Sequence, residues 1–409
     1  MNDRIENKSK ILTYLLVIFF LFSPIDYIMP HFGSATILTV VGLGVSAFAV
    51  FFAFGNESAK VASDQTRILL LMLLMIISNI WAQDTTRSLS YTFSFVATSL
   101  MFFMLFFFKF SKEEIELMET VSIIGGAIFV LYVFTQVDLS LVRAGYRLQL
   151  EQVGNEEYFA DPNGLAARLM MPLIFVVKRI FGKVRIELKV VYCILLATMI
   201  YIIFLTGSRA AVIALAVAGL AVFFAFSGKK ASSAVTFIAI ALVVVILVPN
   251  LLPEHIFDRI FNFEKFKEVM TVEGDRIDIW KNTIFNVFPR SPICGHGAGN
   301  SSIVLADYYG RVKAVHSSWF TMLGDLGFVG FVLWMSLVMG KTKEAYAMRK
   351  SNMYPWAILI VVLIMASTLD AVLEKYLWNA FLYVHMINTT YDRNDKKIPN
   401  EINTVKVIK

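Results

Sequence analysis

The sequence predicts an all-α polytopic membrane protein with about twelve spanning helices. Of its 409 residues, 57% are hydrophobic and 17% charged, whereas the apolar share of soluble domains is roughly 45–50%. The apolar residues gather in runs of about 17 to 22, the length that a helix needs to cross roughly 30 Å of hydrocarbon. Lys and Arg collect in alternate connections between the runs, as they do in membrane proteins. The bilayer is therefore the expected solvent.

The expected spans follow one another through a single integral membrane domain, residues 1–409. The charged segment before the first run leads into a stretch that is longer than a signal-peptide core and has no small-residue cleavage site before Pro30, so we expect a retained helix. The expected spans are residues 11–30, 35–54, 68–83, 89–108, 115–136, 162–178, 190–206, 210–227, 233–250, 318–340, 355–371 and 373–389.

The charge pattern predicts the orientation. One set of connections is rich in Lys and Arg, and by the positive-inside rule it faces the cytoplasm together with both termini and the tail 390–409. The opposite short connections hold only Arg87, Arg143, Arg147, Arg209 and Lys375. Two long connections then face outward, 137–161 and 251–317. Functional residues concentrate in such loops, so the larger loop, 251–317, is the first place to look for a site.

Composition excludes some partners and cofactors. The net charge of +6 does not indicate nucleic acid, because Lys and Arg collect in cytoplasmic loops for topological reasons. Cys193 and Cys294 are far apart, so the sequence predicts neither a disulfide framework nor a thiolate metal site. Within the large loop, 256–270 has helical apolar spacing beside Arg259, which is compatible with a helix in the membrane interface or with one packed on the bundle.

Arg209 ends the segment Thr206-Gly207-Ser208-Arg209 between two apolar runs. This short link places Arg209 at the outer membrane boundary, where a cation is costly without an anionic partner. A diphosphate suits it, because a guanidinium offers forked donors to phosphate oxygens and keeps its charge. The alternative is a topological arginine that snorkels to the interface.

His316 stands where the large loop enters the tenth expected span, in Val315-His316-Ser317-Ser318-Trp319. At the outer interface a neutral imidazole can accept a proton from a sugar hydroxyl near neutral pH. The alternative is a capping or interface residue. The small residues between Gly324 and Gly330, which include Asp325, suit close helix packing.

Two further segments contribute candidate substrate contacts. Arg276 lies in the segment 274–280, and Arg290 opens the glycine-rich segment 290–300. This glycine spacing indicates a closely approached loop but not a nucleotide fingerprint, since no strand precedes it. Arg276 is the second phosphate candidate, Arg290 is grouped with the substrate contacts, and His296 is a weaker rival base.

The sixth expected span carries polar residues at its start. Arg147 precedes it and Asp161-Pro162-Asn163 opens it, with the proline in the first helical turn, as helix starts prefer. Arg168, inside the span, is either a third anion contact or a structural partner of Asp161 or Asp325. Asp161, Asn163, Arg168 and Asp325 are therefore grouped with the substrate-binding residues. Two other features are expected to be structural: Glu374-Lys375 as a local turn pair and His385 as a buried or inner-interface residue.

The order of these motifs resembles the O-antigen ligase and polymerase superfamily of bacterial envelope glycosyltransferases, whose fold is similar to the multi-helix GT-C class. His316-Ser317, nine residues, then Gly327 and Gly330 matches the family's histidine signature. Ser208-Arg209 resembles its membrane-edge Arg-x3-Leu motif, with Ile213 in place of the leucine. The likeness continues in Trp81–Asp84, Asp161–Asn163, Arg276–Trp280 and Ser291–Gly295.

The resemblance implies transfer of a glycan from a polyprenyl diphosphate carrier to an acceptor sugar outside the cytoplasmic membrane, in lipopolysaccharide or surface polysaccharide assembly. It implies inversion at the anomeric carbon and neither a metal nor a cofactor. His316 would be the general base, Arg209 and Arg276 would stabilise the leaving diphosphate, and Arg147 would be a further contact. The expected partners are the lipid-linked donor, a glycan or lipid A core acceptor and membrane lipids, with no nucleic acid.

Three alternatives stay open. A polymerase of the same family would use the growing chain's own repeat as acceptor, where a ligase would use a lipid A core sugar. A lipid-linked sugar flippase or transporter is suggested by the number of spans and by the intramembrane Arg168 and Asp325, although the sequence has no related halves. A membrane scaffold without chemistry would have charged residues that do not converge.

Overall fold

Eleven of the twelve expected spans overlap long helices of the computed structural model, and several of these helices end earlier than expected. It describes residues 10–29, 31–32, 35–54, 61–136, 140, 142, 145–148, 150–152, 155–159, 161–227, 250–262, 264 and 275–395. The ninth expected span lies outside these residues except for its last position. The long helices are α1 (Lys10–Phe22), α2 (Ile37–Phe54), α3 (Ser63–Ser78), α4 (Thr85–Leu105), α5 (Lys112–Gln136), α7 (Pro162–Phe181), α8 (Ile186–Leu205), α9 (Arg209–Ser227), α16 (Ser318–Met348), α17 (Tyr354–Ala366) and α18 (Lys375–Asp395).

Length and composition support a membrane protein. Within the described residues, α4, α5, α8 and α16 are long and apolar enough to cross a bilayer, and α2, α9 and α17 contain shorter apolar helices. In lipid a helix satisfies all of its own backbone hydrogen bonds, which is why apolar sequence of this length forms helices. The total of twelve spans and the GT-C likeness stay predictions.

The bundle is held together by aromatic packing around Trp378 on α18. Its ring stacks on Phe102 of α4 with centroids 5.5 Å apart, and it meets Trp334 of α16 edge-on at 6.1 Å. All three side chains are fully buried. Since lipid tails are as apolar as these side chains, such close packing, and not escape from water, is what favours helix association in a bilayer.

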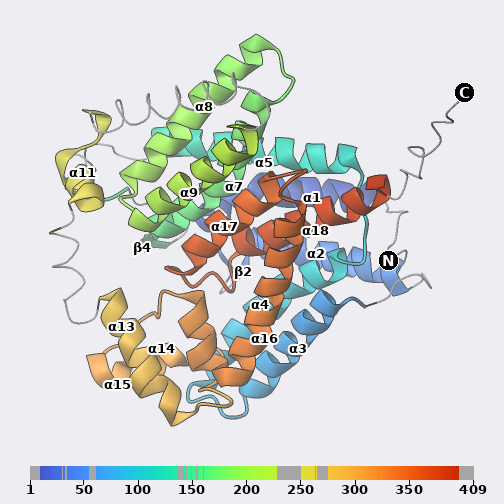
Figure 1. The fold of residues 1–409 in the computed structure, drawn as a ribbon. Helices are drawn as coiled ribbons and strands as arrows, with labels where there is room; N and C mark the ends of the chain where they lie inside the picture. Colours follow the sequence, from blue (N-terminus) through green and yellow to red (C-terminus); the bar gives the residue numbers. More distant parts are fainter. Residues whose placement is uncertain are drawn as a thin grey trace, which may run out of the picture.

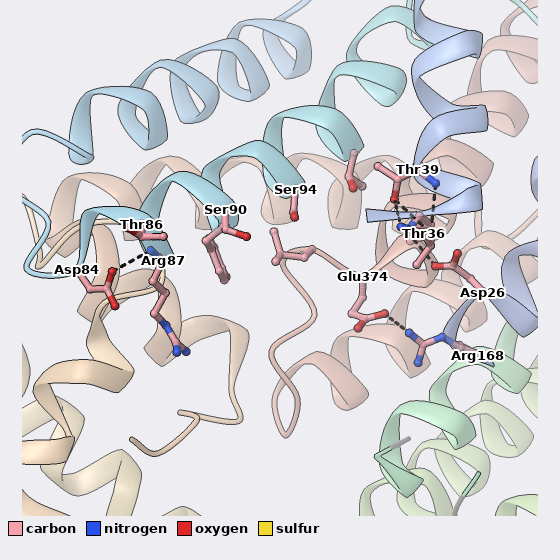
Figure 2. Close-up of a pocket in the computed structure, with 14 residues that line it drawn as sticks. Asp26, Thr36, Thr39, Asp84, Thr86, Arg87, Ser90, Ser94, Arg168 and Glu374 are labelled. Atoms are coloured by element: carbon pink, nitrogen blue, oxygen red, sulfur yellow. Dashed lines mark hydrogen bonds and ion pairs between the residues drawn. The ribbon is translucent and has the colours of Figure 1, made fainter. Parts of the chain in front are cut away.

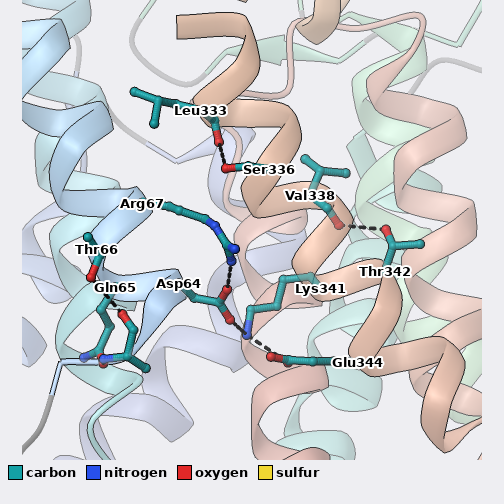
Figure 3. A network of polar contacts seen from close by, with 11 residues as sticks. Asp64, Gln65, Thr66, Arg67, Leu333, Ser336, Val338, Lys341, Thr342 and Glu344 are labelled. Atoms are coloured by element: carbon teal, nitrogen blue, oxygen red, sulfur yellow. Dashed lines mark hydrogen bonds and ion pairs between the residues drawn. The ribbon is translucent and has the colours of Figure 1, made fainter. Parts of the chain in front are cut away.

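A buried ion network joins α3 to α16 (Figure 3). Lys341, whose side chain is 1% exposed, contacts Asp64 at 2.6 Å and Glu344 at 3.0 Å. Arg67 contacts the other oxygen of Asp64 at 2.7 Å. Lys341 thus lies inside the bundle, where it ties two helices together.

Short elements occupy the connections, and two of them are hairpins that an all-α prediction did not contain. β1 (His31–Phe32) pairs antiparallel with β2 (Ala35–Thr36), and β3 (Glu151–Gln152) pairs antiparallel with β4 (Asn155–Phe159). The other short elements are the 3₁₀ helix η1 (Ser23–Ile28), α11 (Glu254–Phe261), α13 (Arg276–Asn282), the π-helix η2 (Thr283–Val287), η3 (Phe288–Arg290), α14 (Ser301–Val304) and α15 (Ala306–Tyr309).

The large loop folds against one side of the bundle (Figure 1). Its second half, from α13 to α15, surrounds a small apolar core of Ile279, Val287, Val304, Leu305 and Val315. In its first half, α11 buries Ile256 completely against the bundle, which agrees with a packed helix; residues 265–270 of the expected amphipathic stretch lie outside the described residues. We call the end of the bundle at which α4, α7, α9, α16 and α18 begin the loop end.

Candidate functional site

Three arginines converge on the turn between α8 and α9. Gly207 adopts a left-handed conformation there (φ 59°), which glycine tolerates because it lacks a Cβ. The Nε of Arg147 donates to the carbonyl of Thr206 at 2.7 Å, and the Nε of Arg259 donates to the carbonyl of Gly207 at 3.2 Å. The Nε of Arg209 donates to the carbonyl of Arg259 at 2.6 Å. The turn therefore orients the guanidinium groups of Arg147 and Arg259, and a carbonyl of α11 orients that of Arg209.

Arg276, at the start of α13, belongs to the same charge cluster. Burial lowers the pKa of Arg147 to about 10, and the positive charges of Arg259 and Arg276 add to this shift. Burial also lowers the pKa of Arg259, with Arg276 as the next cause. Such repulsion requires the cations to lie near one another, and at neutral pH they all stay charged. We call Arg147, Arg209, Arg259 and Arg276 the arginine cluster.

His316 lies beside the arginine cluster in an unusual backbone conformation. Its φ is +53°, and it is the one non-glycine residue with positive φ among the described residues. Strain of this kind persists only where surrounding contacts enforce it. The indole nitrogen of Trp280 donates to the carbonyl of Val315 at 3.0 Å. On the other side of His316, the Ser318 hydroxyl donates to the Leu369 carbonyl at 2.9 Å.

The surroundings of His316 keep its imidazole neutral. Burial lowers its pKa, Arg276 lowers it further, and Asp161 opposes these effects. A histidine with a pKa below its ordinary value of about 6.5 is mostly unprotonated at neutral pH. It can therefore accept a proton, as a general base must.

Asp161 and Asn163 connect the start of α7 with the arginine cluster. One carboxylate oxygen of Asp161 accepts from the backbone nitrogen and from the side-chain nitrogen of Asn163, both at 2.8 Å. The first of these contacts caps the helix. The side-chain oxygen of Asn163 accepts from Nη2 of Arg147 at 3.2 Å. The pair thus helps to orient Arg147, and Asp161 supplies a negative charge that acts on both Arg276 and His316.

Arg168 has a different partner from those expected. Its Nη2 forms a salt bridge with Glu374 at 2.5 Å, and its Nη1 donates to the carbonyl of Gly164. Lys375 forms a salt bridge with Asp26 at 2.9 Å. The prediction of a local Glu374–Lys375 turn pair was therefore wrong, because each residue pairs with a distant helix. His385 was predicted to be buried or at the inner interface, and its side chain is 3% exposed.

Arg290 and His296 have structural partners within the large loop. The two terminal nitrogens of Arg290 donate to the carboxylate of Asp307 at 2.6 Å and to the hydroxyl of Tyr308 at 2.8 Å. The Nε2 of His296 lies 2.9 Å from the carbonyl oxygen of Val287, so this nitrogen must carry a proton and donate it. These contacts explain both residues without a substrate.

Asp325 and Gly327 fasten the glycine-rich loop to α16. The buried carboxylate of Asp325 accepts from the backbone nitrogens of Gly299 at 2.7 Å and Ser301 at 2.8 Å. Gly327 interrupts the helix with φ 65° and ψ −161°, and a Cβ on it would lie 2.4 Å from the carbonyl oxygen of Ile293. Gly327 of the histidine signature is thus needed because two backbones approach closely there. Asp325 holds the glycine-rich loop through its hydrogen bonds to Gly299 and Ser301.

Arg259 is the member of the arginine cluster that sequence reasoning did not single out. It was visible only as one basic residue of an amphipathic stretch. The signal that could have found it is the helical spacing of this stretch. Arg259 lies three residues after Ile256 and so on the same side of the helix, and in the structure that side packs on the bundle, because Ile256 is buried.

Residues 194–335 match a family model that is described as O-antigen ligase. The matched range begins in α8 and ends in α16, so it contains Arg209, Arg259, Arg276 and His316. Arg147 and Asp161 precede it. A comparison with curated proteins gave no match. The family match confirms the resemblance that the sequence motifs predicted.

Proposed function

We propose that this membrane protein, whose residues 194–335 match the O-antigen ligase family model, is a ligase that transfers a glycan from a polyprenyl diphosphate to an acceptor sugar hydroxyl. The transfer takes place at the outer face of the bacterial cytoplasmic membrane, with both termini in the cytoplasm. The observation that carries the proposal is the arginine cluster beside a neutral His316. The large loop, 251–317, is the extracytoplasmic element that supplies most of the site.

The arginine cluster suits a diphosphate because its charge is poorly balanced. Among the described residues, Arg147 and Arg259 donate to carbonyl and amide oxygens, which orient a guanidinium without cancelling its charge. Asp161 and Asp275 are the acidic groups that act on the cluster. Among the residues that the structure describes, the four guanidinium groups outnumber these two carboxylates, and bidentate guanidinium contacts are well matched to phosphate oxygens. A bound diphosphate would relieve the repulsion among the arginines.

In the proposed reaction His316 takes the proton of the acceptor hydroxyl. The hydroxyl oxygen attacks the anomeric carbon and forms the new glycosidic bond, while the bond from that carbon to the phosphate oxygen breaks with its electron pair on oxygen. The leaving polyprenyl diphosphate gains negative charge, and the arginines stabilise it. A single displacement inverts the anomeric centre.

Reconstitution tests the proposal. Purified protein in proteoliposomes, given a polyprenyl-diphosphate oligosaccharide and an acceptor glycan, is expected to form a glycosidic bond. His316→Ala and Arg209→Ala should each abolish most of the rate, and the exposed Arg311→Ala in the same loop should not. Full rates in both site variants, with the protein folded, would refute the mechanism.

The acceptor separates a ligase from a polymerase of the same family, and glycan chain length in a deletion strain distinguishes the two. The flippase alternative rested on Arg168 and Asp325. Since Arg168 pairs with Glu374 and Asp325 holds the loop, these charges have structural roles that do not require transport. Flipping by the purified protein without bond formation would favour that alternative.

A further inference from the structure

A cavity lined mainly by polar and charged residues lies at the loop end, and these residues differ in kind from the arginine cluster. It has a volume of about 530 Å³, within the range of about 300–1,000 Å³ of small-molecule sites. α4, α7, the α17–α18 connection and the region of η1 and β2 all contribute to it (Figure 2). Of the fourteen residues that line it, Leu373 alone is apolar. We call it the hydroxyl cavity.

The hydroxyl cavity takes its name from a row of side chains on α4. Thr86, Ser90, Ser94 and Thr98 all line it, and their spacing of four residues keeps them on one broad face of a helix. The row runs from the exposed Thr86 and Ser90 to Thr98, which is 7% exposed. At 1.5 Å per residue it descends about 18 Å into the bundle. A helix that faced only lipid would gain nothing from such a row.

These four hydroxyls have no hydrogen-bond partner among the described residues. Two other hydroxyls of α4 have partners, since Thr92 donates to the Met75 carbonyl and Ser99 to the Phe95 carbonyl, whereas the buried hydroxyl of Ser88 has none among the described residues. Buried or half-buried hydroxyls in proteins normally find partners. The row facing the cavity is thus available to a ligand with many donors and acceptors of its own.

The charges in the hydroxyl cavity are balanced. Its six charged residues are three cations and three anions, and four of them pair with one another as Arg168–Glu374 and Lys375–Asp26. A phosphate at Arg168 or Lys375 would have to break these pairs, and a lipid chain would leave the hydroxyls unsatisfied. An uncharged sugar leaves the ion pairs intact and offers hydrogen-bond partners to the hydroxyls.

Two contacts connect the hydroxyl cavity with the catalytic candidates. Ser318, two residues after His316, donates to Leu369 and accepts from the backbone nitrogen of Ala371 at 2.8 Å, and this segment continues into Glu374. On α7, Arg168 donates to Gly164, in the helical turn that begins after Asp161. The cavity therefore adjoins the elements that position the proposed base.

We propose that the hydroxyl cavity binds sugar units of the acceptor glycan next to the hydroxyl that His316 deprotonates; this inference rests on the proposed function. The Thr86–Thr98 row supplies hydrogen bonds to sugar hydroxyls, and the Arg168–Glu374 pair offers both a donor and an acceptor at one wall. The donor's diphosphate and the acceptor's sugars are then held by two sites of different charge.

The test uses the full chain in nanodiscs. The probe is a set of short, lipid-free and phosphate-free fragments of the source cell's own surface glycan, with binding followed by saturation-transfer NMR. Ser94→Leu fills the cavity, and Leu89→Phe adds bulk to an exposed position of the same helix. We expect Ser94→Leu to weaken fragment binding at least about tenfold, roughly the loss of one or two hydrogen bonds. Binding of undecaprenyl diphosphate should not change in either variant.

A second variant removes hydroxyls without adding bulk. Thr86→Ala/Ser90→Ala changes two exposed positions at the mouth and should also weaken fragment binding. Unchanged binding in both cavity variants overturns the inference, as does transfer by a wild-type protein that binds no fragment. If the wild type binds fragments through Ser94 but forms no glycosidic bond, sugar binding in the hydroxyl cavity is supported and the proposed glycan transfer is refuted. If transfer proceeds and Ser94→Leu leaves the acceptor KM unchanged, the proposed glycan transfer is supported and acceptor binding in the hydroxyl cavity is refuted.

Discussion

Arg209 and Arg259 hold each other across the α8–α9 turn. The side chain of Arg209 donates to the backbone carbonyl of Arg259 at 2.6 Å, and the side chain of Arg259 donates to the carbonyl of Gly207, two residues before Arg209, at 3.2 Å. Arg209 of the motif and Arg259 of the large loop are therefore joined by two hydrogen bonds between their segments. Loss of either side chain removes a positive charge and one of the two contacts that fasten α11 to the α8–α9 turn.

We predict that Arg259→Ala lowers the transfer rate about 10²-fold, the size of effect seen when one preorganised donor to a developing oxyanion is removed. Arg259→Lys should recover only part of it, because an ammonium lacks the guanidinium fork. Initial rates in proteoliposomes measure both variants, with Arg311→Ala as the control. A wild-type rate in Arg259→Ala would exclude the residue from the site.

The pH profile should report His316. Burial and Arg276 lower its pKa, and the base form is the active one, so the wild-type kcat/KM should fall on acidification only below the ordinary histidine pKa of about 6.5. Arg276→Gln removes a positive charge that disfavours the imidazolium. The pKa of His316 should then rise and the acidic limb should move to higher pH, whatever the absolute rate. A limb that stays in place would contradict the assignment of His316 as the base.

Gly327→Ala should destabilise the protein by several kcal/mol. Its backbone conformation is one that non-glycine residues adopt only at a cost of about 1–3 kcal/mol, and the added Cβ would collide with the Ile293 carbonyl. Gly44→Ala on α2 is the matched control, since a Cβ there meets nothing within 4 Å. Alanine should raise helix stability at Gly44 by up to about 1 kcal/mol. Thermal unfolding in detergent gives both changes, and equal midpoints would refute the close-approach role of Gly327.

Lys341→Met should cost about 3 kcal/mol, the lower end of the range for breaking a buried ion pair, because Glu344 loses its cation while the nearly buried Asp64 keeps only Arg67. The double variant Lys341→Met/Glu344→Gln should recover part of the loss, since it also removes one of the stranded charges. Unfolding midpoints of the two variants and of Glu344→Gln alone complete the comparison. If Lys341→Met alone is as stable as the wild type, the network does not hold α3 to α16.

The sequence was sufficient to place helices, because apolar length alone selects them in a bilayer. It also singled out Arg209, Arg276 and His316, because each occurs in a recognisable motif at the edge of an apolar run; their catalytic roles stay predictions. It was not sufficient for Arg259, Glu374 or Lys375. Their roles depend on how α11 and the α17–α18 connection fold back on distant helices, and spacing along the chain carries no record of that.

Asp325 and Arg168 are residues for which the sequence could not identify the partner. A charge inside an apolar run predicts a functional role by default, and both were grouped with the substrate contacts. Three-dimensional packing gives each a backbone or side-chain partner in the protein. Sequence identifies a charge that needs a partner, and only the folded chain decides whether that partner is protein or substrate.

The break in α16 at Gly327 has a consequence for how this kind of protein can diversify. Main-chain hydrogen bonds from His296, Gly297 and Phe328 fasten the glycine-rich loop to the helix, while the side chains of Ile293 and Cys294 point to the exterior. Exposed residues of the loop such as Ile293 and Cys294 can therefore be substituted one at a time without moving His316, which lies eleven residues before Gly327. On the proposed function, new glycan preferences can evolve while the backbone around His316 stays fixed.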